Sequence, residues 1–283
     1  MSMSPFAREL EEALAIARKA SAVVMSVYAT PFAVELKGPN DPVTRADREA
    51  NDLICAALSA AFPGDAILAE ESAPKRPEEI AALVQRERVW FVDPLDGTRE
   101  FAARNGEFAV MVGLAIHGRA VLGVVVLPTT GEAFVGCRGQ DGGRGQAFLE
   151  EASGERRPLV VSSLTDPREA TLIISRSHRP RIVEPVSAQL GIHKLIPCGS
   201  VGVKVARVAR GAADLYIHGG RGAMRWDVCA PEAILDAAGG RFTDIEGEPM
   251  DYRTTDLALD NGIVASNGAL HDVVLAVTSV YSG

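Results

Sequence analysis

The chain has few aromatic residues and few cysteines. Only 5% of its 283 residues are Phe, Trp or Tyr, and its four cysteines are scattered without a CxxC pair. Its five histidines also lack the spacing of metal ligands. This pattern argues against a disulfide framework or a zinc site and is typical of a cytoplasmic protein with reduced thiols.

An excess of basic residues and a long hydrophobic run are also absent. Lys and Arg number 29 against 37 Asp and Glu, so the formal net charge is -8, which argues against a protein that coats nucleic acid. No window is long and apolar enough to span a membrane, and charges throughout the first 20 residues argue against a signal peptide. A small anionic substrate stays compatible with this composition, because a bound metal can invert the local field.

Hydrophobic periodicity divides the chain into two differently patterned parts. The first part predicts a helix over about residues 5–28, a second helix that begins near Asp47, short strands in AILAEES and RVWFV, and three antiparallel strands between residues 106 and 137. After a Gly-rich connection, strands and helices alternate. We therefore predict an α+β domain with an antiparallel sheet over residues 1–150, and an α/β domain over residues 151–283.

The stretch RVWFVDPLDGTREF combines an apolar strand with two aspartates. Pro94 cannot donate a ladder hydrogen bond, so we expect the strand to end there. Asp93 and Asp96 would then lie at the carboxyl end of the strand, beside free N–H groups of a helical turn that begins at Thr98. Carboxylates suit Mg²⁺ and free N–H groups suit phosphate, although a type I turn explains the same residues.

Other acidic residues also lie at the ends of predicted elements. Glu70 ends the strand in LAEES, and Asp47 and Asp227 open helices in VTRADREA and RWDVCAPEAIL. Taken singly, the two aspartates are most simply helix N-caps, and Glu70 belongs to a solvated loop. The sequence pattern alone leaves both interpretations open.

Four blocks together carry a resemblance to a known family: DPVTRAD, AEES, WFVDPLDGTREF and WDVCAPEAILDAAGG, in this order between residues 41 and 240. They resemble the signature blocks of the inositol monophosphatase superfamily of metal-dependent, lithium-sensitive phosphatases. LDGTREF, ISRSH and GSVGVKVARVARGAADLY most resemble the CysQ-type 3'(2'),5'-bisphosphate nucleotidases. The resemblance implies a layered α/β/α/β/α sandwich, the inositol monophosphatase-like (sugar phosphatase) fold.

The resemblance also implies roles for individual residues. It implies two or three Mg²⁺ ions and five ligands for them: Glu70, Asp93, the Leu95 carbonyl, Asp96 and Asp227. Asp93 would bridge the first ion, held also by Glu70 and Leu95, and the second, held also by Asp96 and Asp227. Thr98 and Asp47 would take the proton of an attacking water, and the N–H groups of Gly97 and Thr98 would bind the phosphate.

Specificity residues are expected in the second half. Lys204 falls at the edge of the apolar stripe of its predicted helix, where it would line a cleft; with Ser200 it could contact a second phosphate, or it could be a surface lysine. Ser177 and His178 follow the apolar run TLIIS, so they are substrate candidates by position, or else part of a surface loop.

The activity that this resemblance implies is hydrolysis of the 3'-phosphate of adenosine 3',5'-bisphosphate, or of its phosphosulfate form, by two-metal activation of water. Its setting would be sulfate assimilation in the cytoplasm, with a small phosphorylated substrate and no nucleic-acid polymer. The alternatives are inositol-1-monophosphatase or fructose-1,6-bisphosphatase activity on the same fold, or a non-catalytic metal or nucleotide sensor. The sequence leaves the oligomeric state open, a homodimer included.

Overall fold

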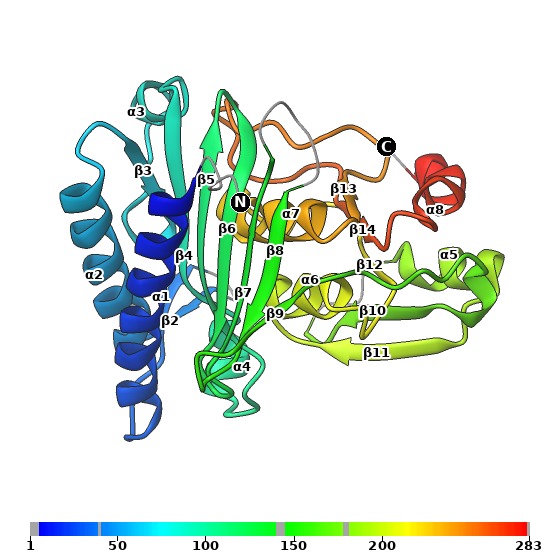
Figure 1. The fold of residues 1–283 in the computed structure, drawn as a ribbon, viewed down its shortest axis with the longest axis horizontal. Coiled ribbons are helices and arrows are strands. Elements are labelled where there is room, and N and C mark those ends of the chain that lie inside the picture. Colours follow the sequence, from blue (N-terminus) through cyan, green and yellow to red (C-terminus); the bar gives the residue numbers. More distant parts are fainter. Residues whose placement is uncertain (1–5, 39–40, 140–144, 178–180, 282–283) are drawn as a thin grey trace.

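The computed structural model describes residues 6–38, 41–139, 145–177 and 181–281 (Figure 1). Within them no helix combines the length and the apolar character needed to cross a bilayer. The elements form five layers, in which helices alternate with two sheets. This arrangement confirms the predicted α/β/α/β/α sandwich.

The larger sheet has seven strands in the order β3-β4-β5-β6-β7-β8-β9. Their bounds are β3 (Ala66–Ala69), β4 (Arg88–Asp96), β5 (Ala109–Ile116), β6 (Arg119–Leu127), β7 (Glu132–Cys137), β8 (Gln146–Glu150) and β9 (Arg156–Pro158). Only the first pair, β3 and β4, is parallel, and the others are antiparallel. The three antiparallel strands predicted between residues 106 and 137 are confirmed as β5, β6 and β7.

The smaller sheet has five strands in the order β11-β10-β12-β14-β13. Their bounds are β10 (Thr171–Ser175), β11 (Lys194–Cys198), β12 (Leu215–His218), β13 (Arg241–Thr243) and β14 (Ile263–Ser266). β10 runs parallel to β11 and β12, whereas β14 is antiparallel to β12 and β13. The carboxyl ends of three parallel strands therefore share one edge, where ligands of α/β sheets bind.

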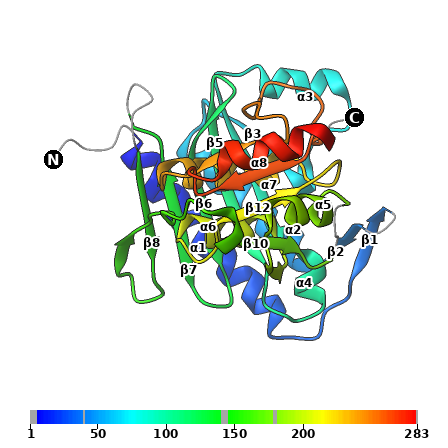
Figure 2. The ribbon, with the colours of Figure 1, turned by 90° about the vertical axis from the view of Figure 1, so that its right-hand side faces the viewer.

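Helices cover both sheets and fill the space between them. α1 (Ala7–Tyr28) and α2 (Arg45–Ala61) lie on the outer face of the large sheet, and α6 (Val201–Ala209) and α7 (Arg225–Ala237) lie between the sheets (Figure 1). α5 (Val183–Leu190) and α8 (His271–Thr278) cover the outer face of the small sheet (Figure 2). The remaining elements are short: the hairpin β1 (Glu35–Gly38) and β2 (Asp41–Val43), α3 (Pro77–Val84), α4 (Thr98–Ala102), and 3₁₀ turns at Glu70–Ser72, Pro167–Glu169 and Ser279–Tyr281.

Three hydrophobic clusters fill the four interfaces between the five layers, because the middle cluster spans two of them. One joins α1 and α2 to the large sheet, the second surrounds α6 and α7 between the sheets, and the third joins α5 and α8 to the small sheet. Every layer thus buries an apolar face against its neighbour, as layered folds require. The division of the chain into domains at residue 150 stays a proposal.

A row of glycines lets α7 approach the large sheet closely. Gly113 pairs with Gly123, and Gly123 pairs with Gly136, so the three lie side by side on β5, β6 and β7. A Cβ at Gly123 would lie 2.1 Å from the Ala230 carbonyl oxygen, and one at Gly136 would lie 2.6 Å from the Ile234 Cα. Only glycine leaves room for the helix backbone here, so the three glycines let the middle of α7 pack directly on the sheet.

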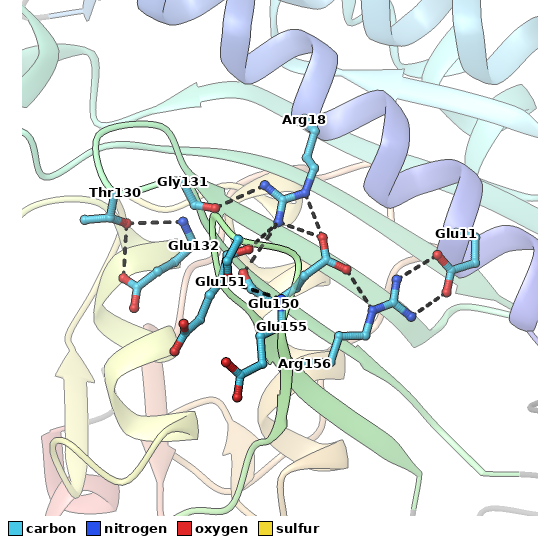
Figure 3. A network of polar contacts seen from close by, with 10 residues as sticks. Glu11, Arg18, Thr130, Gly131, Glu132, Glu150, Glu151, Glu155 and Arg156 are labelled. Atoms are coloured by element: carbon cyan, nitrogen blue, oxygen red, sulfur yellow. Dashed lines mark hydrogen bonds and ion pairs between the residues drawn. The ribbon is translucent and has the colours of Figure 1, made fainter.

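An ionic network attaches α1 to the β8–β9 hairpin (Figure 3). Arg18 donates to Glu150 Oε1 at 2.7 Å and to the Gly131 carbonyl at 3.1 Å. Arg156 donates to the other Glu150 oxygen at 2.7 Å and to both carboxylate oxygens of Glu11. Glu150 is buried, so its two arginine partners offset the cost of removing its charge from water.

Candidate active site

The predicted metal ligands line a single cavity of about 460 Å³, within the usual size range of small-ligand sites. Its walls come from β4, α4, α6, β12 and the start of α7, so both sheets contribute. All five predicted ligands are among the lining residues: Glu70, Asp93, Leu95, Asp96 and Asp227. The structure therefore brings together groups that are up to 157 positions apart, from Glu70 to Asp227.

The end of β4 differs from the sequence expectation. We expected the strand to end at Pro94, but β4 continues to Asp96, which pairs with Ala109. The expectation was wrong because the register shifts between Asp93 and Asp96, and such an irregularity accommodates a proline that cannot donate to the ladder. Both aspartates consequently reach the cavity, and the Leu95 N–H donates to Asp93 Oδ1 at 2.9 Å.

Asp47 and Asp227 occupy the same position in their helices. Each is the third helical residue, and each accepts a hydrogen bond from the backbone N–H before the helix: Thr44 to Asp47 at 2.7 Å, and Met224 to Asp227 at 2.8 Å. They are thus first-turn residues and not N-caps, which corrects the simplest interpretation of their sequence position. This geometry holds each carboxylate at the positive end of a helix dipole.

Burial and mutual repulsion raise the pKa values of the clustered carboxyl groups. Burial raises the pKa of Asp93 well above its ordinary value, and the charges of Glu70, Asp96 and Asp227 add to the effect. Burial, together with the neighbouring acids, likewise raises the pKa of Asp227. Burial also raises the pKa of Glu70, to about 7. Such a cluster is stable in its ionised form only beside cations.

Several of these oxygens accept hydrogen bonds from protein donors. Asp96 Oδ2 accepts from the Ser200 hydroxyl at 2.5 Å and from the Gly202 N–H at 2.7 Å. Lys37 on β1 donates to Glu70 Oε1 and Glu71 Oε1, both at 2.7 Å, and these carboxylates raise the pKa of Lys37 although burial opposes them.

The donor set nevertheless fits Mg²⁺ in its chemistry. In the described part of the chain, no group of three or more Asp, Glu, His or Cys side chains is arranged to hold a metal ion as it stands. The printed contacts use one oxygen of each carboxylate, Glu70 Oε1 and Asp96 Oδ2, so coordination through the second oxygen would not require these partners to leave. The cavity, however, offers only carboxylate and carbonyl oxygens at the predicted positions, which is what a hard divalent cation prefers.

Thr98 and Asp47 are in direct contact. The Thr98 hydroxyl donates to Asp47 Oδ1 at 2.9 Å, with the Leu95 carbonyl as a second acceptor at 3.2 Å. Asp47 is buried, and burial raises the pKa of its carboxyl group although the Thr44 and Thr98 donors oppose the rise. Thr98 lines the cavity, so the pair forms a chain of polar groups that leads from the cavity to a buried carboxylate.

Gly97 and Thr98 form a turn that faces the cavity. Gly97 has φ of 97°, a conformation that side chains disfavour, and a Cβ there would lie 3.0 Å from the Glu107 carbonyl oxygen. Both residues line the cavity, immediately before the rest of α4. The turn therefore places a backbone segment against the space that the acids surround.

Lys204 and Ser200 also line the cavity, but both have protein partners. Ser200 adopts φ of 55°, donates to Asp96 and accepts from the Val203 N–H at 3.0 Å, which caps α6. Lys204 is 3% exposed, and its Nζ lies 5.0 Å from the centroid of the Tyr216 ring. Burial lowers the pKa of Lys204, and the nearby charge of Asp96 opposes this. Their roles as substrate contacts stay predictions.

Ser177 lines the cavity and donates to Glu100 Oε1 at 2.6 Å, whereas His178 lies outside the described residues. Sequence reasoning did not single out Glu100, His218 or Arg221, which also line the cavity. His218 ends β12, so the rule on carboxyl ends of parallel strands could have identified it. No comparable sequence signal marks Arg221.

Comparisons with known proteins agree with the overall fold. The pattern of the inositol monophosphatase family matches residues 7–280. The 3'(2'),5'-bisphosphate nucleotidase CysQ of Escherichia coli O157:H7 is 37% identical over 259 residues, 91% of this chain and 99% of that protein. The crystal structure of CysQ from Bacteroides thetaiotaomicron is 29% identical, with a TM-score of 0.75, over 93% of this chain and 98% of that chain. The extragenic suppressor protein suhB from Bartonella henselae is 26% identical, with a TM-score of 0.80, over 96% of this chain and 98% of that chain. The chain therefore belongs to the inositol monophosphatase family.

Proposed function

We propose that this protein is a Mg²⁺-dependent phosphomonoesterase that converts adenosine 3',5'-bisphosphate to AMP and phosphate. The observation that carries the proposal is the convergence of Glu70, Asp93, Asp96 and Asp227 on one cavity, beside the Thr98–Asp47 pair. The choice of substrate rests on the similarity to CysQ proteins over 91% of the chain.

Glu70, Asp93, Asp96, Asp227 and the Leu95 carbonyl would hold two or three Mg²⁺ ions. When bound, the ions supply positive charge that neutralises the phosphate oxygens and the carboxylate cluster. The pKa values raised by burial and repulsion support this assignment, because a cation removes the repulsion that raises them.

The remaining chemistry belongs to residues of the chain. Water attacks phosphorus, the P–O bond to the ribose 3' oxygen breaks, and the bond's electron pair passes to that oxygen, which takes up a proton. Thr98 orients the water and passes its proton toward Asp47 Oδ1, 2.9 Å from the threonine hydroxyl. The N–H groups of Gly97 and Thr98 hold the phosphate oxygens during this step.

Contacts to the rest of the substrate come from the second half of the chain. Ser200 and Lys204 are proposed to face the nucleotide, with Ser177 and His178 as further candidates. Because Ser200 and Lys204 also neighbour Asp96, substrate and acid cluster would share these groups.

Inhibition by Li⁺, action on the phosphosulfate form and a place in sulfate assimilation belong to the same proposal. So does a cytoplasmic location, with which the four free cysteines agree.

A panel of phosphate-release assays tests the proposal. The purified chain is given adenosine 3',5'-bisphosphate, inositol 1-phosphate or fructose 1,6-bisphosphate, with Mg²⁺ and with or without Li⁺. We expect the highest kcat/KM for the nucleotide and loss of activity when Mg²⁺ is removed by chelation. Equal kcat/KM for inositol 1-phosphate would overturn the substrate assignment, and no phosphate release from any substrate would favour a sensor.

A further inference from the structure

The proposed substrate carries two phosphates, and the acid cluster accounts for only one of them. The inference here rests on the proposed function and concerns the other phosphate. Three long cationic side chains line the cavity: Arg99, Lys204 and Arg221. The three side chains differ in burial and in their present partners, and therefore in how readily each could bind a second phosphate.

Arg99 and Lys204 both lie close to the acid cluster. Arg99 directly follows Gly97 and Thr98, so it belongs to the same short segment as the proposed cradle for the scissile phosphate. Lys204 is enclosed, with its Nζ against the Tyr216 ring and its charge near Asp96. Lys204 can still face the nucleotide, but its enclosure leaves it less free than the exposed Arg221 to exchange its partners for a second phosphate.

Arg221 lines the cavity from the loop between His218 and Arg225, which joins β12 to α7. Its side chain is 75% exposed, and its Nε donates to Asp260, whose side chain is 50% exposed. The charge of Asp256 also acts on Arg221. An ion pair this exposed to water contributes little to stability, so exchanging its anion costs little.

We propose that Arg221 binds the second phosphate of the substrate, and that this phosphate replaces Asp260 as its partner. A guanidinium group presents paired N–H donors that match two phosphate oxygens, and a phosphate dianion attracts it more strongly than a single carboxylate does. Asp260 holds the side chain at the cavity wall while the site is empty of substrate. Arg221 is thus a specificity residue that distinguishes bisphosphates from monophosphates.

The test compares adenosine 3',5'-bisphosphate with adenosine 3'-monophosphate, which lacks the group that Arg221 would bind. Arg221→Gln should lower kcat/KM for the bisphosphate by about 10- to 100-fold, through KM, because one charge-assisted contact is lost. The same variant should change kcat/KM for the monophosphate less than about twofold. Arg168→Gln is the matched control, because Arg168 is 77% exposed, pairs with Asp166 and does not line the cavity.

Asp260→Asn gives a second measurement in the opposite direction. Removing the competing carboxylate should lower KM for the bisphosphate and leave the monophosphate unchanged. Thermal unfolding of all variants separates these effects from loss of fold. Equal loss with both substrates in Arg221→Gln, or no loss with either, overturns the inference. If the wild-type protein does not hydrolyse the bisphosphate, the proposed function itself is wrong. That result is distinct from a failure of the Arg221 inference, which requires an active wild type.

Discussion

Replacing Asp47 with asparagine tests the proposed proton path, because the surrounding hydrogen bonds dictate how the amide must lie. Asp47 Oδ2 accepts from both the backbone N–H and the hydroxyl of Thr44, at 2.7 and 2.6 Å, and Oδ1 accepts from Thr98. An asparagine has a single oxygen, which will face the two Thr44 donors. Its NH₂ group then donates to the Thr98 hydroxyl, whose own proton turns to the Leu95 carbonyl, 3.2 Å away.

This rearrangement removes the proton acceptor and keeps most of the structure. We expect Asp47→Asn to lower kcat by about 10²- to 10⁴-fold, the usual contribution of a general base, with little change in KM. The free energy of unfolding should fall by only about 1 kcal/mol, since both Thr44 contacts survive and the Thr98 contact only reverses its direction. Phosphate release under saturating substrate and Mg²⁺ gives kcat, and urea denaturation gives stability. Asp52→Asn, an exposed position on the same helix, is the control.

Two outcomes would refute this reasoning. One is a variant that keeps more than a tenth of the wild-type kcat, since the amide cannot accept the proton. The other concerns Thr98: Thr98→Ser, which retains the hydroxyl, should keep most of the activity, and Thr98→Val should lose as much as Asp47→Asn. Equal activity in the serine and valine variants would show that the hydroxyl takes no part.

Three further predictions concern stability. Burial raises the pKa of Glu232 to about 8, so between pH 4.5 and 8 the folded state keeps a proton that the unfolded state has lost. The free energy of unfolding therefore falls as pH rises, by at most about 1.4 kcal/mol per pH unit, and Glu232→Gln should flatten this slope in urea titrations at pH 5 and 8. Gly123→Ala places a methyl group against the Ala230 carbonyl and should cost about 1–3 kcal/mol in the same assay. Glu150→Gln weakens the pairs with both Arg18 and Arg156 (Figure 3) and should cost about 1–2 kcal/mol.

A different measured outcome would contradict each of these three stability predictions. If the free energy of unfolding changes equally between pH 5 and 8 in the wild type and in Glu232→Gln, the buried-proton argument is wrong. Wild-type stability in Gly123→Ala would mean that the helix can retreat from the sheet without cost. A loss that high salt does not reduce in Glu150→Gln would point to packing in place of charge.

Long, strongly patterned elements could be predicted from the sequence, because their apolar residues repeat with the period of the element. The helix expected over residues 5–28 is α1, and the strands read in β4 to β7 bury nearly every side chain. The family resemblance supplied the list of acidic residues, and the structure brings that list to one cavity.

Short, exposed elements could not be predicted in this way. The hairpin that carries Lys37 has no buried face in β1, so no periodicity marks it. Its contact with Glu70, which lies 33 positions later, depends on the tertiary fold. The same holds for Arg221, whose partner Asp260 is 39 residues away. The proline in β4 misled the prediction, because a register shift that absorbs it depends on the neighbouring strand.

The close contact between α7 and the glycines of β5, β6 and β7 bears on when the acid cluster is completed during synthesis. α7 is made late, at Arg225–Ala237, whereas the strip of sheet without side chains that receives it comes from Gly113, Gly123 and Gly136. Until the helix arrives, the nascent chain presents that strip to the surrounding water and lacks the carboxylate of Asp227. All seven strands of the large sheet precede α7 in the chain, so the whole sheet is synthesised before the acid cluster receives its last carboxylate.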